Sequence, residues 1–94
     1  MKKFAFVSRH VPTDGQVKLA AEKDVELVYV GDIDAFTITS IGLEKFEGVV
    51  VVHPAAALRL FHEFPIGVFE NALRAKEGAP LQFEAVAFHI YHIF

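Results

Sequence analysis

Apolar residues along the chain fall into short runs separated by polar residues, glycines and prolines. The first two runs are Phe4–Val7 and Val25–Val30. Runs of this length that are rich in Val, Phe and Tyr favour strands over helices. Between them, Thr13 and Gln16 have the spacing of a capping box, which predicts a helix that begins at Thr13 or one residue later. The first third of the chain therefore predicts a β–α–β unit with parallel strands.

The middle of the chain carries the clearest strand pattern. Val49–Val52 is a run of four β-branched residues, which predicts a strand buried on both faces at the centre of a parallel sheet. His53 and Pro54 end this strand. Because proline suits the first position of a helix, we expect a helix from Pro54 to Phe61.

The remaining segments complete the order of elements. Within residues 32–47, Phe36–Thr39 fits a short strand, a helical turn or a loop, and a short helix is expected over 43–46. Pro65 begins a predicted helix that continues to about Glu77 and ends at a glycine cap. Its apolar residues recur at helical spacing and would share one face: Ile66, Phe69 and Leu73. Residues 83–93 read as a last strand that is apolar on both faces.

This order predicts one α/β domain over residues 1–94. The expected fold is Rossmann-like, with a mainly parallel sheet of about four or five strands flanked by helices. Apolar residues make up 53% of the chain and include ten Phe. That exceeds what the core of a small isolated domain needs, so we expect a subunit interface and a homodimer.

Composition excludes several classes of function. With no cysteine, the chain has no disulfide, thiolate nucleophile or sulfur-based zinc site. Its formal net charge of −3 argues against binding to extended nucleic acid. The apolar stretch behind Lys2 and Lys3 stops at Ser8, too early for a signal peptide or a membrane span. These features predict a cytoplasmic protein that does not bind membranes.

The loop after the first strand is the strongest candidate for a functional site. Ser8, Arg9 and His10 place a hydroxyl, a cation and an imidazole just before the helix that begins near Thr13. A helix N-terminus offers unpaired N–H groups to an anion. Arg9 can pair a phosphate bidentately, and His10 can act as a general acid or base near neutral pH. The alternative is an ordinary polar loop in which Arg9 and His10 are solvated or form a salt bridge.

Two further strand ends bring polar residues toward the same edge of the sheet. Gly31, Asp32 and Asp34 follow the second strand, and His53 follows the third, just ahead of Pro54. Ligands of open α/β sheets bind beyond the carboxyl ends of the strands, so His10 and His53 are expected to face one crevice. The alternatives are a solvated turn residue for Asp32 and a helix-start histidine bound to a backbone carbonyl for His53. The catalytic candidates are Arg9, His10 and His53. The candidates for ligand binding are Ser8, Thr13, Gly31, Asp32 and Pro54.

Cofactor motifs are missing from these loops. The first loop lacks the Gly-x-Gly-x-x-Gly pattern of dinucleotide-binding proteins, and no phosphate-binding loop ending in Gly-Lys-Ser/Thr is present. His10 and His53 would supply half of a zinc site, without an evident third ligand. We therefore predict neither a cofactor nor a metal ion.

Three stretches resemble a small family of accessory proteins of type III CRISPR systems, of the Csx type. Phe6–His10 is similar to the Phe-Val-Ser-Arg-His end of that family's first strand. Gly48–Leu58 is similar to its central strand, proline break and Ala/Leu helix, and Phe88–Tyr91 to its last strand with a histidine. The chain departs from the family pattern over residues 66–78 and just before them.

The resemblance implies a Rossmann-like fold related to domains that sense cyclic oligoadenylate. It further implies that the protein binds this second messenger. If the protein is an enzyme, the expected reaction is cleavage of the messenger without a metal ion. A cyclic oligonucleotide or another small phosphate compound is the expected ligand. The alternatives are a non-catalytic nucleotide-binding or regulatory module of a mobile element or phage, and a protein-interaction domain.

Overall fold

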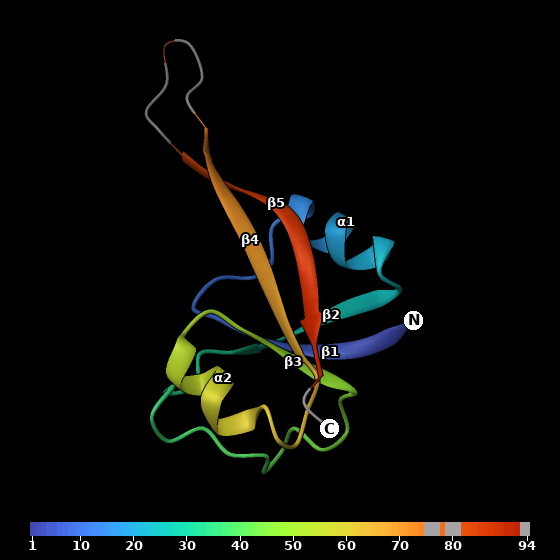
Figure 1. Cartoon of the computed structure of the whole chain (residues 1–94), viewed down its shortest axis with the longest axis vertical. Coiled ribbons are helices and arrows are strands. Elements are labelled where there is room, and N and C mark those ends of the chain that lie inside the picture. The colour runs from blue at the N-terminus through green and yellow to red at the C-terminus, as the bar shows by residue number, and fades with distance from the viewer. Residues whose placement is uncertain (75–77, 79–81, 93–94) are drawn as a thin grey trace.

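The described residues of the chain form one five-stranded sheet with two helices (Figure 1). The structure is a computed structural model that describes residues 1–74, 78 and 82–92. The strands lie in the order β2-β1-β3-β4-β5, and every neighbouring pair is parallel except β4 with β5. In chain order the elements are β1 (Lys2–Val7), α1 (Asp14–Glu22), β2 (Val25–Gly31), β3 (Gly48–Val51), α2 (Pro54–Leu60), β4 (Ile66–Arg74) and β5 (Gln82–Tyr91). The predicted α/β class and the mainly parallel sheet are confirmed.

The β1–α1–β2 unit follows the local sequence pattern. Thr13 Oγ1 accepts the Gln16 backbone N–H at 3.1 Å, and Gln16 Oε1 accepts the Thr13 backbone N–H at 2.9 Å. This capping box begins α1 at Asp14, as predicted. After α1 the chain forms β2, which lies parallel to β1. The pairing of the two strands starts with Lys2 and Val25.

The strand at the centre of the sheet is β3, which is buried along its whole length. Its first residue is a glycine, Gly48, and the Phe4 ring occupies the space where a side chain would lie. A Cβ at this position would come within 2.4 Å of the Phe4 ring. Val52 lies one residue beyond the strand and is 72% exposed. The predicted central strand is therefore confirmed, with its end one residue earlier.

Side chains of the central strands alternate between the two faces of the sheet, as the strand period of two requires. One cluster joins the odd-numbered positions of β1 and β3 to α2 and to the segment between β2 and β3: Ala5, Val7, Val49, Val51, Ala56, Leu60, Ile38, Leu43 and Phe46. The other joins their even-numbered positions to α1 and β5: Phe4, Phe6, Val50, Ala20 and Phe88. The two helices therefore cover opposite faces of the sheet.

Residues 32–47, between β2 and β3, form turns and an irregular loop. The short helix expected over 43–46 is not present, although Leu43 and Phe46 are buried. Arg59 on α2 holds this segment in place, because its Nε donates to the Ile38 carbonyl oxygen at 2.9 Å.

The helix predicted from Pro65 is wrong, because the segment forms β4. Ile66 pairs with Val49 on β3, and from Ile66 to Arg74 the strand pairs with β5. Gly67 lies against the Phe88 ring, where a Cβ would approach to 2.6 Å. Pairing with a distant strand overrides the helical spacing of the apolar residues.

The predicted last strand is present as β5, which runs from Gln82 to Tyr91. Gly78, predicted as a helix cap, lies in a turn with φ +75°. Residues 75–77 of the predicted helix and residue 93 of the predicted strand lie outside the described residues. The far end of β4 and β5 extends away from the other strands (Figure 1). Among the described residues, neither helix has the length and apolar character needed to cross a membrane.

Candidate functional site

A hollow of about 610 Å³ lies at the carboxyl ends of β1, β2 and β3. From β1 the chain moves outward to β2 and then returns to β3 on the other side of β1. Open α/β sheets bind their ligands at such a reversal of strand order. The polar residues that line the hollow are Ser8, Arg9, His10, Asp32, Asp34 and His53. The predicted convergence of the first and third strand ends is therefore present.

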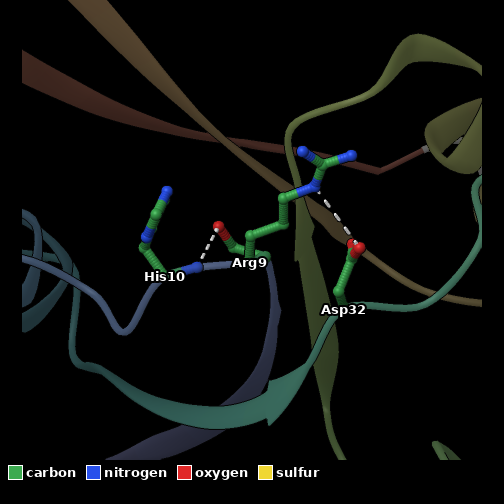
Figure 2. A network of polar contacts seen from close by, with 4 residues as sticks. Arg9, His10 and Asp32 are labelled. Carbon is green, nitrogen blue, oxygen red and sulfur yellow. Dashed lines mark hydrogen bonds and ion pairs between the residues drawn. The ribbon is translucent and has the colours of Figure 1, made fainter.

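The turn after β1 orients the first polar group of the hollow. The Ser8 backbone N–H donates to the Gly31 carbonyl oxygen at 3.0 Å, which continues the pairing of β1 with β2. Ser8 Oγ accepts the His10 backbone N–H at 3.2 Å. Arg9 therefore extends toward Asp32, while the His10 ring points away from that pair (Figure 2).

Arg9 and Asp32 form a loose ion pair, with 3.6 Å between Arg9 Nε and Asp32 Oδ2. Their side chains are 83% and 59% exposed, and such surface pairs contribute about 0–1 kcal/mol to stability. The salt bridge considered as the alternative role of Arg9 is therefore present, but it is weak. The contact with Asp32 lies at Nε, and within the described residues it leaves the terminal nitrogens of the guanidinium for a ligand.

His53 caps α2 with its side chain. Its Nδ1 accepts the Ala55 backbone N–H at 3.0 Å, so Nδ1 carries no proton in this arrangement. The neutral ring therefore holds its proton on Nε2. The expected alternative, a bond from His53 to a backbone carbonyl, is wrong because the partner is an N–H group. Pro54 follows as the first residue of α2.

Three of the predicted ligand-binding residues do not line the hollow. Thr13 caps α1, and its hydroxyl oxygen accepts a hydrogen bond from the Gln16 backbone N–H. Neither Thr13 nor any residue of α1 is among the described residues of the hollow wall, so the expected anion site at this helix start is not part of it. Gly31 turns the chain after β2 with φ +90°, and Pro54 shapes the start of α2. These residues position the site from outside it.

Among the described residues, no three His, Asp or Glu side chains gather closely enough to hold a metal ion.

No family model, curated protein or solved structure matches the chain. The resemblance to Csx-type accessory proteins therefore remains a prediction.

Residues 33–36 make one wall of the hollow, of which the sequence patterns indicated Asp34 and missed the apolar residues. Asp34 Oδ1 accepts the Phe36 backbone N–H at 2.8 Å, and the Asp34 carbonyl accepts the Ile38 N–H at 2.9 Å. The Phe36 ring meets the His53 ring at 5.3 Å between centroids, in a T-shaped arrangement. An aspartate two residues before a phenylalanine, just after the Gly31 turn, was the available signal for this wall.

Proposed function

We propose that this hollow binds cyclic oligoadenylate and opens the ring without a metal ion. The observation that carries the proposal is the convergence of Arg9, His10 and His53 on one hollow at the reversal of strand order. Each of these groups has hydrogen-bonding capacity left for a ligand. A guanidinium and two imidazoles that line one hollow suit a phosphodiester, which carries negative charge before and during cleavage.

Arg9 is the phosphate-binding group in this proposal. Its guanidinium is exposed and engaged only through Nε, so it can turn its terminal N–H groups to a phosphate. A guanidinium presents paired donors that match phosphate oxygens, which gives orientation as well as attraction. Asp32 attracts the guanidinium at Nε, 3.6 Å away, and steadies the side chain while the terminal nitrogens hold the ligand.

The reaction needs proton transfer at two oxygens. A ribose 2′-hydroxyl attacks the adjacent phosphorus, forming a 2′-O–P bond and breaking the bond to the 5′-oxygen of the next nucleotide. The products are a 2′,3′-cyclic phosphate and a 5′-hydroxyl. In the described part of the chain no hydrogen bond engages the His10 ring, which lines the hollow, and we assign it the role of taking the 2′-hydroxyl proton. His53 keeps its proton and donates a hydrogen bond from its Nε2–H to a phosphate oxygen. His10, protonated by the 2′-hydroxyl, then gives that proton to the departing 5′-oxygen.

The size of the hollow bears on how many chains act together. Clefts of about 300–1,000 Å³ hold one drug-sized ligand, so about 610 Å³ suits one or two nucleotide units. A ring of four or six nucleotides would extend beyond the hollow. A two-fold dimer presents the same patch twice to a symmetric ring, so we propose that two chains enclose one ring.

The test is incubation with cyclic tetra-adenylate and cyclic hexa-adenylate in EDTA, followed by separation of the products. We expect linear products that end in a 2′,3′-cyclic phosphate. His10→Ala should lower the rate about 10²- to 10⁴-fold. Arg9→Ala should weaken binding about ten- to a hundred-fold, because it removes charge-assisted hydrogen bonds.

Two exposed residues outside the hollow wall provide matched controls. Lys18→Ala removes one positive charge from α1, and His62→Ala removes one imidazole beyond α2. Both variants should retain full activity. Tight binding without linear products would contradict the catalytic part of the proposal and indicate a binding module. Absence of both binding and cleavage would contradict the whole proposal and favour an interaction domain.

A further inference from the structure

Phe36 is a large apolar side chain that the fold does not use in its core. It is 69% exposed and belongs to neither buried cluster. It nevertheless lines the hollow, as does Val52, which is 72% exposed. An apolar wall beside polar groups is typical of sites that bind small organic ligands.

The backbone around Phe36 is fixed before any ligand arrives. Asp34 accepts the Phe36 N–H through Oδ1 and the Ile38 N–H through its carbonyl oxygen. Ile38 is buried, and its own carbonyl is held by Arg59 of α2. The aromatic ring therefore stands on a turn that Asp34 closes and that Ile38 ties to α2.

The remaining polar groups of the hollow indicate what this ring would contact. Arg9 and His10 line the same hollow and favour a phosphate. The His53 ring meets Phe36 at an interplanar angle of 67°, and most of the Phe36 side chain stays exposed to solvent. A ligand that fits both walls carries a flat aromatic group and a phosphate in one molecule. Nucleotides have this combination, and their bases stack on aromatic side chains.

We propose that Phe36 is the base-stacking residue of the hollow, so that the ligand's purine lies on its ring while the phosphate meets Arg9. The assignment rests on the proposed function for the location of the ligand, and it names the part of the site that recognises the base. It also gives a role to a large aromatic side chain that stands exposed beside the polar groups of the hollow.

The experiment compares AMP with ribose 5-phosphate, which has the sugar and phosphate but no base. We expect AMP to bind the unaltered protein about ten-fold more tightly in a calorimetric titration. Phe36→Ala should abolish this preference and leave the affinity for ribose 5-phosphate unchanged. Ile41→Ala is the matched control, because Ile41 is an exposed apolar residue of the same segment that does not line the hollow.

A second variant gives a direct optical signal. The chain contains no tryptophan, so Phe36→Trp introduces a single indole at this position. Its emission should be quenched saturably by AMP and not by ribose 5-phosphate, since only the base can stack on the ring.

The outcomes separate the two proposals. Equal affinity for AMP and ribose 5-phosphate would overturn the stacking role of Phe36 while leaving a phosphate site. Base-dependent binding through Phe36 without cleavage of cyclic oligoadenylate would overturn the catalytic function and keep the stacking role. Failure of both compounds to bind would overturn the stacking role and the phosphate site together.

Discussion

At the scale of single residues, His53 joins the fold to the candidate chemistry through its two ring nitrogens. Nδ1 accepts the Ala55 N–H and so takes part in starting α2. Nε2 is left for the hollow that His53 lines. The structural role and the proposed chemical role are therefore carried by different atoms of one side chain, and different substitutions can separate them.

Replacement of His53 by Asn should preserve the start of α2 and remove the imidazole, because Asn is a good helix cap. His53→Ala should lower the free energy of unfolding by about 1 kcal/mol, since it removes the cap altogether. Urea denaturation measures this difference, and cleavage of cyclic oligoadenylate should be lost in both variants. Retained cleavage in His53→Asn would remove His53 from the proposed reaction.

Gly48 shows how closely the sheet packs at its centre. A Cβ there would lie 2.4 Å from the Phe4 ring, so Gly48→Ala should lower the free energy of unfolding by about 1–3 kcal/mol. Gly15→Ala is the matched control, because its Cβ would have Thr13 Oγ1 at 3.9 Å as its nearest neighbour. Thermal denaturation of both variants checks this, and equal melting temperatures would contradict the described packing of Phe4.

At the scale of elements, the sequence predicted those parts that depend on local patterns. The capping box at Thr13, the apolar run of β3 and the proline of α2 each determine an element within a few residues. The segment that forms β4 could not be predicted in this way. Its apolar residues have helical spacing, and only pairing with β3 and β5 makes it a strand.

The candidate site was predictable to a similar extent. The strand ends at Ser8–His10 and His53 were expected to converge because parallel strands end at one edge of the sheet. The wall carrying Phe36 was not predicted. Its conformation depends on the Asp34 turn and on the contact of Ile38 with α2, and neither leaves a periodic pattern in the sequence.

Substitution in the cap of α1 tests whether this helix takes part in ligand binding. Thr13→Ala removes the hydroxyl that accepts the Gln16 N–H, which should cost about 1 kcal/mol of stability. Because α1 is not part of the described hollow wall, the affinity for cyclic oligoadenylate should stay within about two-fold of the unaltered protein. Chemical denaturation and calorimetry measure the two quantities. A ten-fold loss of affinity in a folded variant would show that the helix start contacts the ligand.

At the scale of the whole molecule, the volume of the hollow and the exposed apolar residues both concern the number of chains that bind one ring. Large apolar side chains such as Val52, Leu58 and Phe83 are more than two-thirds exposed. Together with the limited size of the hollow, this exposure supports the proposal that two chains enclose one ring.

Light scattering coupled to size-exclusion chromatography tests this arrangement. We expect twice the 10.5 kDa mass of one chain when cyclic tetra-adenylate is present, and calorimetry should give one ring per two chains. A ligand-saturated monomer that binds one ring per chain would contradict it.

The central claim is that the ligand lies in the hollow formed by the ends of β1, β2 and β3. Titration of ¹⁵N-labelled protein with cyclic tetra-adenylate, followed by two-dimensional NMR, tests it most directly. The account predicts that the largest shifts occur at the amides of Ser8–His10, Asp32–Phe36 and His53. Absence of shifts at saturating ligand, or shifts confined to the far end of β4 and β5, would contradict it.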